Sequence, residues 1–183
     1  MAKKPNLKQR GAVIRTHQAD GVDSVAVYDP TEVYRFYLER TWDSEQAVVA
    51  FIGLNPSTAT EYQNDPTVNR CQNFAAAWGY GGFIMLNAYG LRSTDPRGLK
   101  TIDDPVGSLN NHYTLLGVER AALVMCCWGT HAGLGNRHEA LRELLKGREV
   151  HCFRRTKAGY PNHPLYLRND SRPVPYWTPD SSQ

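Results

Sequence analysis

Short apolar runs alternate with helix-like apolar stripes along the chain, which predicts strands and helices in turn. Residues 12–15 and 25–28 are apolar runs separated by Gly21, a pattern that predicts a small hairpin. In residues 34–42 apolar and charged positions alternate, which predicts a strand with one face toward water. Residues 47–54 are apolar throughout, as expected of a strand that helices cover on both faces.

The helix and strand patterns then repeat three times. Asp65 and Pro66 predict a helix start, with Asp65 as the N-cap, and Gly79 marks the end of that helix. Ser108 is expected to cap a second helix. The stripes that should face the core are Val68, Cys71, Ala75 and Trp78 in the first helix, Leu109, Tyr113 and Leu116 in the second, and Ala140, Leu141, Leu144 and Leu145 in a third over 137–146. The strands expected between and after these helices are residues 83–87, 121–128 and 150–153.

The alternation of strands with helices predicts the fold class. It implies parallel pairing through right-handed crossovers. We therefore expect an α/β protein, a three-layer α/β/α sandwich with a mainly parallel four-stranded central sheet and added N-terminal antiparallel strands. Residues 11–170 should form one domain, between a basic flexible tail at 1–10 and a C-terminal tail at 171–183.

Composition narrows the class of protein. A chain of 183 residues with 41% hydrophobic residues has the size and core of one globular domain. Its longest apolar runs, 47–54 and 121–128, are eight residues each, whereas a membrane span needs about 18 or more. The basic start has no apolar region behind it, unlike a secretory signal. We expect a cytoplasmic protein with no membrane partner.

The charge distribution permits a nucleic-acid partner. The net charge is only +3, but basic residues gather near both ends of the chain, and such clustering favours phosphate binding. The alternative is a flexible tail and a solvated face. The clustered residues are Lys3, Lys4, Lys8 and Arg10, and then Arg148, Arg154, Arg155, Lys157, Arg168 and Arg172.

Polar residues follow each of the four strands expected to pair in parallel. In open α/β sheets, ligands bind outside the carboxyl ends of such strands. The segments 53–59, 87–92, 128–133 and 156–166 carry amides, hydroxyls, histidines or glycines, and the topology should bring them to one rim. A neutral hydrogen-bonding pocket flanked by cations suits a nucleobase or nucleotide.

Each of these residues also has a purely structural interpretation. Asn55 and Pro56 are typical of a strand-ending turn. Asn87 can satisfy the backbone of a neighbouring loop, and Trp128 can belong to the core. His131 and His163 are loop histidines. Their shared placement is what favours a functional site.

Four segments, in order, resemble the uracil-DNA glycosylase superfamily. Residues 53–56, Gly-Leu-Asn-Pro, are similar to the Gly-Ile-Asn-Pro motif of its mismatch-specific branch, and 83–87 resemble the strand that ends in a base-reading asparagine. Residues 124–132 are similar to the Leu-Leu-Trp-Gly-Ser-His-Ala stretch of the uracil-specific branch, and His163-Pro164 to the start of the His-Pro-Ser-Pro motif. The fuller string Gly-Leu-Asn-Pro-Ser-Thr-Ala also resembles an uncharacterised bacterial and phage family, which implies no activity.

The glycosylase resemblance implies a role for each candidate residue. Asn55 would position a water molecule, although an amide cannot deprotonate it. Asn87 would read the edge of a base, and His163 would stabilise the departing base as an anion. Arg155 and Lys157 would contact phosphate, with His131 as an outer partner. The remaining residues expected to bind substrate are Gly53, Pro56, Ser57, Trp128, Gly129 and Leu165.

The chain departs from the superfamily pattern at two points. Residues 163–166 read His-Pro-Leu-Tyr, so Leu165 is only a candidate for the leucine that penetrates the duplex. No phenylalanine follows Pro56 to stack on the base; the candidate substitutes are Tyr62, Tyr89 and Tyr160. DNA, RNA, a nucleotide or a nucleoside therefore all remain open as substrate.

We expect no cofactor and no metal. Some branches of the superfamily bind an iron–sulfur cluster through four cysteines, but Cys126 and Cys127 are adjacent in a strand and point to opposite faces. Cys71 lies on the core stripe of a helix, and the histidines lack zinc-site spacing.

Three functions follow from this sequence. The first is a glycosylase-like hydrolase that cleaves a base from DNA or a nucleotide, with Asn55 and His163 as catalytic residues. The second is a non-catalytic module that binds a nucleobase, nucleotide or nucleic acid. The third is a nucleotide hydrolase or transferase that uses Asp65. The expected partner is a nucleobase, a nucleotide or DNA, and the expected state is a monomer.

Overall fold

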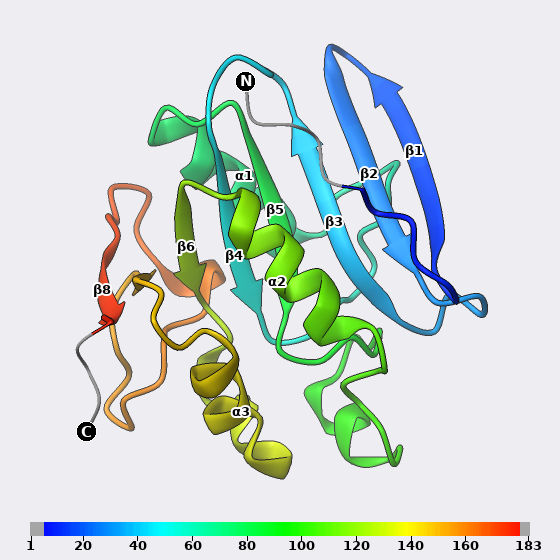
Figure 1. Cartoon of the computed structure of the whole chain (residues 1–183). Helices are drawn as coiled ribbons and strands as arrows, with labels where there is room; N and C mark the ends of the chain where they lie inside the picture. Colours follow the sequence, from blue (N-terminus) through cyan, green and yellow to red (C-terminus); the bar gives the residue numbers. More distant parts are fainter. Residues whose placement is uncertain (1–5, 180–183) are drawn as a thin grey trace.

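The computed structural model describes residues 6–179 as an eight-stranded mixed sheet with three α helices (Figure 1). Lys3 and Lys4 of the expected basic tail lie outside the described residues. The mixed α/β organisation is the one that the sequence predicts. The strands are β1 (Val13–Ala19), β2 (Val22–Tyr28), β3 (Arg35–Thr41), β4 (Val48–Gly53), β5 (Gly82–Asn87), β6 (Leu123–Cys126), β7 (Val150–Cys152) and β8 (Val174–Trp177). The helices are α1 (Pro66–Ala77), α2 (Asn110–Arg120) and α3 (Arg137–Leu144), with 3-10 turns η1 (Pro96–Lys100), η2 (Gly129–Asn136) and η3 (Pro164–Tyr166).

The sheet combines antiparallel edges with parallel pairs. The strand order is β1-β2-β3-β5-β4-β6-β7-β8. β4 pairs in parallel with β5 and β6, and β6 with β7, whereas β1, β2, β3 and β8 join by antiparallel pairing. The carboxyl ends of β4, β5 and β6 therefore meet at one edge of the molecule, where the sequence places its polar segments.

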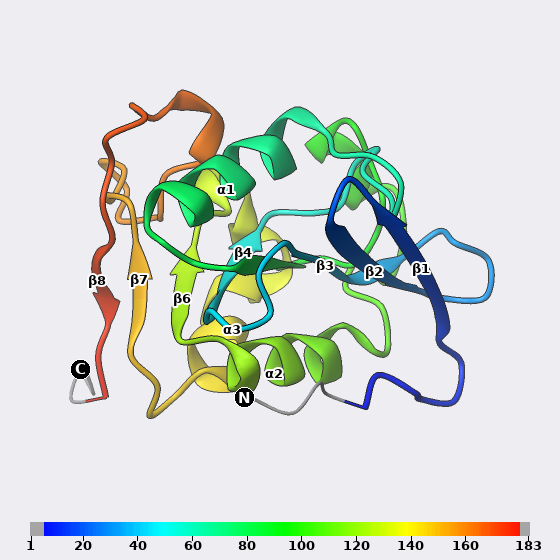
Figure 2. The same ribbon diagram turned by 90° about the horizontal axis from the view of Figure 1, so that it is seen from above.

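The helices lie on both faces of the sheet. Figure 2 shows α1 on one face and α2 and α3 on the other. Side chains alternate along β4, so Phe51 packs in the hydrophobic cluster on the α1 side, while Ile52 packs in the cluster on the opposite side. Two hydrophobic cores thus fix the sheet and its connecting loops.

The expected start of α1 is confirmed. The Asp65 side chain accepts a hydrogen bond from the Val68 amide, and Pro66 occupies the first turn. The expected cap of α2 is wrong, because Leu109 occupies the N-cap position and no side chain caps this helix. Instead, Asn110 in the first turn donates from Nδ2 to the carbonyl oxygens of Asn87, at 2.9 Å, and of Ala88, at 3.3 Å.

The expectation that β3 has a face toward water is also wrong. Every residue of β3 is buried. Glu39 forms an ion pair with Arg120 and accepts a hydrogen bond of 2.8 Å from the Tyr37 hydroxyl. The period of two is real, but the polar face is covered by partners that neutralise it.

The strand β8 was not predicted. It lies within residues 171–183, where the sequence suggests a tail, and it pairs with β7 at the edge of the sheet. Pro175 within it hides the strand pattern, although proline is tolerated in edge strands. None of the helices in the described part of the chain has the length and apolar character that crossing a membrane requires.

Candidate functional site

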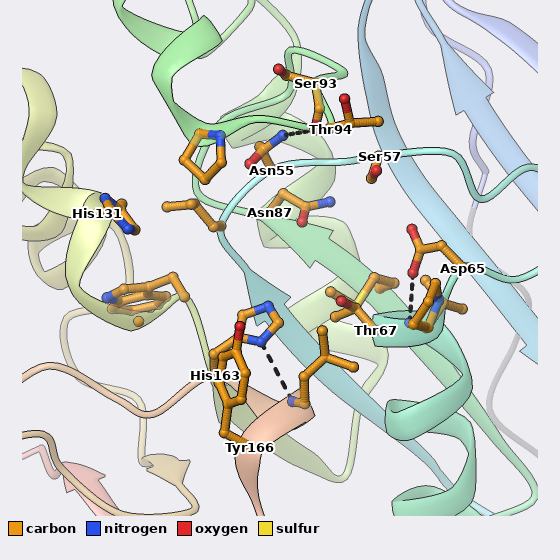
Figure 3. A pocket seen from close by; sticks show the side chains of 18 of the residues that line it. Asn55, Ser57, Asp65, Thr67, Asn87, Ser93, Thr94, His131, His163 and Tyr166 are labelled. Carbon is orange, nitrogen blue, oxygen red and sulfur yellow. Dashed lines mark hydrogen bonds between the residues drawn. The ribbon is translucent and has the colours of Figure 1, made fainter.

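A pocket of about 550 Å³ lies at the carboxyl ends of β4, β5 and β6 (Figure 3). Its walls come from segments that are far apart in sequence: the loop after β4, the start of α1, the loop after β5, η2 and the segment around η3. The pocket thus joins the polar segments that follow the strands. The predicted site residues that line it are Asn55, Ser57, Asn87, Trp128, Gly129, His131, His163 and Leu165.

Asn87 offers an unused hydrogen-bonding group to this pocket. Its side chain is 1% exposed, and neither Nδ2 nor Oδ1 has a hydrogen-bond partner among the described residues. A buried polar atom without a partner costs about 1–3 kcal/mol. Asn87 therefore does not satisfy a neighbouring loop through its side chain, and both atoms remain available to a ligand.

Gly53 lies beside Asn87 and makes room for it. The two residues are register partners at the ends of β4 and β5. A Cβ atom on Gly53 would lie 3.0 Å from Oδ1 of Asn87 and 2.5 Å from Cε of Met85. Gly53 does not line the pocket itself, and it acts through the position of its neighbour.

The orientation of Asn55 is fixed by two backbone carbonyls. Its Nδ2 donates to the oxygen of Pro56 at 2.9 Å and to that of Ser93 at 2.8 Å. Because carbonyls only accept, the amide nitrogen must face them, and Oδ1 is left as the free acceptor. Figure 3 shows this oxygen turned away from Ser93.

His163 presents a defined nitrogen to the pocket. Its Nδ1 accepts a hydrogen bond of 3.4 Å from the Leu165 amide, at the start of η3. Burial lowers the pKa of His163, and the negative charge of Asp65 opposes this shift in part. The neutral imidazole therefore carries its proton on Nε2, which makes Nε2 a hydrogen-bond donor.

The mouth of the pocket carries exposed side chains from η2 and η3. His131 is exposed, Leu165 is 38% exposed and Tyr166 is 80% exposed. The backbone of η3 is held by Arg70, which donates to the carbonyl oxygens of Pro164 and Leu167. Leu165 and Tyr166 are thus displayed on a fixed turn.

Trp128 and Gly129 form a structural wall. The Trp128 indole is 1% exposed and packs 5.9 Å from the His138 ring and 5.7 Å from the Trp177 ring. Gly129 has a φ of +70°, a conformation that favours glycine, and its amide donates to the Pro161 carbonyl at 2.9 Å. This hydrogen bond ties the end of β6 to the segment that carries His163.

Besides Gly53, three predicted residues lie outside the pocket lining. Pro56 is buried behind it, where its carbonyl accepts from the Ser93 amide at 2.8 Å. Arg155 donates to the Tyr176 carbonyl at 2.7 Å and its guanidinium lies 5.1 Å from the Tyr176 ring centroid, so its charge is directed at the β8 edge. Lys157 is exposed and does not line the pocket. The structure does not bring these two cations to the site.

None of the tyrosines considered for stacking lines the pocket. Tyr89 is buried and donates to the Leu134 carbonyl, Tyr160 packs on His138, and Tyr62 packs on His17. The aromatic side chain at the mouth is instead Tyr166. It follows His163 by three residues, a signal present in the sequence but not used.

Further polar residues that sequence reasoning did not assign to substrate binding also line the pocket. Arg35 is 1% exposed and belongs to the face of β3 that was expected to be wet. Asp65, 6% exposed, accepts from the amides of Val68 at 2.9 Å and Ala59 at 3.4 Å. The hydroxyl residues in the lining include Thr58, Thr67, Ser93, Thr94 and Thr130.

Within residues 6–179, no three His, Cys, Asp or Glu side chains are grouped as metal ligands. The four cysteines are buried and free. Burial raises the pKa of Cys126 and of Cys152, the latter to about 11, which keeps these thiols protonated.

Comparison with known proteins places the site within a family. A family model described as "Protein of unknown function (DUF1643)" matches residues 35–165. The matched segment begins at buried Arg35 and ends at Leu165 on the mouth of the pocket. No curated protein and no solved structure matches the chain.

Proposed function

The chain belongs to the DUF1643 family of proteins of unknown function, and from the geometry of its site we propose that it is a glycosylase-like hydrolase. It cleaves the N-glycosidic bond of a base in DNA or in a nucleotide. The observation that carries this proposal is the buried amide of Asn87, which has no partner and lines the same pocket as Asn55 and His163. We further propose that the fold is the three-layer sandwich of the uracil-DNA glycosylase superfamily.

Asn87 is suited to reading the base. Its amide offers one donor group and one acceptor atom side by side, which match the donor and acceptor on the Watson–Crick edge of a base. The neighbouring Gly53 and the contacts of Asn110 with the Asn87 backbone hold this group in place. Base binding would satisfy two atoms that are otherwise buried without partners.

His163 is suited to the departing base. As the C1′–N bond breaks, its electron pair moves onto the base, and the Nε2–H of neutral His163 donates to a carbonyl oxygen where that charge collects. A donor held in this way contributes about 3 kcal/mol to the transition state. The base then takes a proton from solvent.

Asn55 is suited to orienting the water that adds to C1′. Its Oδ1 is free to accept a hydrogen bond from that water, because Nδ2 is held by two carbonyls. The amide cannot take the proton, which passes to solvent as the sugar cation is captured. This chemistry would be slower than that of an enzyme with a carboxylate base.

A second candidate, a non-catalytic binding module, is favoured by one observation. Among the described residues, Asp65 is the only carboxylate residue that lines the pocket. Its oxygens already accept hydrogen bonds from two backbone amides. Without a carboxylate free to act as a general base, the same pocket would bind a nucleobase and leave its glycosidic bond intact. A nucleotide hydrolase or transferase that uses Asp65 is less well supported for the same reason.

Incubation with oligonucleotides that contain uracil, hypoxanthine or mismatched bases, and separately with nucleotides, tests the proposal. We expect free base in the chromatogram, lost in His163→Ala and Asn87→Ala. The matched controls are His112→Ala on the exposed surface of α2 and Asn69→Ala on that of α1, which should retain activity. Tight binding without released base in all substrates would support the binding module. Phosphate release that depends on Asp65 would support the third function.

A further inference from the structure

The loop after β4 is held from behind by arginines that bind its carbonyl oxygens. Arg35 donates from Nη1 to Ala59 O at 2.6 Å, and Arg92 from Nε to Ser57 O at 3.5 Å. Arg40 donates from Nη2 to Thr60 O and, at 3.4 Å, to Gln63 O. These bonds fix the loop against β3 and the segment after β5, and they occupy four of its carbonyl oxygens.

This loop and the start of α1 carry several donors without a partner. Among the described residues, the amides and hydroxyls of Ser57 and Thr58 have no hydrogen-bond partner, and neither does the hydroxyl of Thr67. All three residues line the pocket. Thr67 lies in the first turn of α1, where Pro66 has no N–H and the Val68 amide already donates to Asp65, so the donors that Thr67 itself carries are the ones this turn can offer.

Arg35 adds a buried cation with an unused donor. It is 1% exposed, lines the pocket, and its Nε has no partner in residues 6–179. Burial lowers its pKa to about 10, and the nearby charge of Asp65 opposes this shift in part. Because a pKa of about 10 is still well above neutral pH, the guanidinium remains charged. An unsatisfied, desolvated guanidinium binds strongly to an oxyanion that accepts from it.

The charges around the loop leave an excess of positive charge. Arg35, Arg40 and Arg92 oppose two carboxylates, Asp65 and Glu61. Glu61 accepts a hydrogen bond of 2.9 Å from the Tyr28 hydroxyl, and Asp65 accepts from two backbone amides. Both carboxylates are thus satisfied by groups other than the unused donor of Arg35.

We propose that Arg35, Ser57, Thr58 and Thr67 form a subsite for a phosphate group, so that the substrate is a phosphorylated nucleoside unit and not a free base or nucleoside. In Figure 3, Ser57 and Thr67 lie on the side of Asn87 opposite His131, which separates this subsite from the mouth that carries His131. The assignment of the rest of the ligand as a nucleoside rests on the proposed function; the phosphate subsite does not. It replaces Arg155 and Lys157 as the phosphate contacts.

Isothermal titration tests the subsite with inorganic phosphate and with 2′-deoxyuridine, its 5′-monophosphate and its 3′-monophosphate. We expect inorganic phosphate to bind and at least one monophosphate to bind about 10-fold or more tightly than the nucleoside. The dinucleoside monophosphate of deoxyuridine distinguishes the source of the phosphate. Its tighter binding would indicate a nucleic-acid strand, and tighter binding of a monophosphate would indicate a nucleotide.

Hydroxyl removal tests the residues. The double variant Ser57→Ala, Thr67→Val should lose most of the preference for phosphate and retain its affinity for the nucleoside. The control Thr16→Val, Ser108→Ala removes two exposed hydroxyls elsewhere and should keep the preference. Arg35→Gln should abolish phosphate binding if urea titration shows that it is folded; if it is unfolded, the double variant decides.

Two results would overturn the subsite. The first is that neither inorganic phosphate nor any monophosphate binds. The second is that the double variant retains the full preference for phosphate. The base-release assay is separate. Phosphate preference without base release rejects the glycosylase and keeps the subsite, whereas base release without phosphate preference rejects the subsite and keeps the glycosylase.

Discussion

Gly53 and Asn87 are direct partners in the parallel pairing of β4 with β5, and a Cβ atom on Gly53 would lie 3.0 Å from Oδ1 of Asn87. The same atom would lie 2.5 Å from Cε of Met85, the flexible end of a buried side chain. Gly53 thus determines where the unpartnered amide of Asn87 can sit.

Replacement of Gly53 by alanine should therefore weaken ligand binding more than it weakens the fold. Met85 can shift its flexible end, whereas Oδ1 of Asn87 must move by a few tenths of an ångström, which displaces the group that contacts the ligand. We expect affinity to fall about 10-fold and the free energy of unfolding to fall by about 1–3 kcal/mol, as for other overpacked cores. Titration calorimetry and urea unfolding measure the two effects. Gly133→Ala is the control, because its Cβ would lie at an ordinary 3.4 Å from the Tyr160 hydroxyl; equal affinity loss in both variants would contradict the role of Gly53.

The pKa of His163 should make stability depend on pH. Burial lowers this pKa in the folded protein, so the unfolded chain binds more protons in the interval between the two values, and stability rises with pH there. The loss begins as pH falls through about 6.5, the pKa of an exposed histidine, and ends at the lower folded value. Protonation of Nδ1 also removes the acceptor of the Leu165 amide.

Urea unfolding of the wild type and of His163→Gln, from about pH 7.5 to 5, isolates this effect, because the difference between their free energies of unfolding changes with pH only where His163 binds different numbers of protons in the folded and unfolded chains. Groups common to both proteins, including His138, whose pKa burial also lowers, cancel in the difference. We expect the wild type to lose more stability than the variant on acidification. Parallel curves would show that His163 has the same pKa in the folded and unfolded chains.

The sequence could predict this site where local pattern and topology were sufficient. Asn55, Asn87 and His163 follow strands whose apolar runs are unambiguous, and the ends of parallel strands must meet. It could not identify Arg35, because alternation along β3 gives the face of a residue but not whether that face is later covered. Whether a cationic side chain on such a face lies near a pocket depends on tertiary distances, which the spacing of residues along the sequence does not give.

The same limit applies to Arg155, which the structure places outside the pocket lining. Its place in a basic segment after β7 suggested a phosphate contact, but β8 supplies a carbonyl and a ring that bind its guanidinium. β8 itself was hidden by Pro175. One missed edge strand therefore changed the interpretation of a charged residue 20 positions away along the chain.

Arg155→Ala should destabilise the protein without reducing ligand affinity. The variant loses one hydrogen bond and one cation–π contact, together about 1–2 kcal/mol for a partly exposed pair. Thermal unfolding measures the first effect and titration with oligonucleotide the second. Lys157→Ala, which removes an exposed cation of the same segment, provides the comparison. A fall in affinity in Arg155→Ala with unchanged stability would restore it as a phosphate contact.

Tyr166 should distinguish a nucleic-acid substrate from a free nucleotide. Its ring is 80% exposed at the mouth of the pocket, on a turn that Arg70 holds in place, so the fold gains little from it. If a strand binds, a base adjacent to the one in the pocket can stack on this ring, and stacking of this kind contributes about 1–3 kcal/mol.

Tyr166→Ala should then weaken binding of a short single strand about 5- to 150-fold and leave mononucleotide affinity and thermal stability unchanged. The control is Tyr62→Ala, which removes a tyrosine that is 67% exposed and outside the pocket lining. Equal strand affinity in wild type and Tyr166→Ala would contradict stacking at this position, and a loss of mononucleotide affinity would place the ring over the bound base itself.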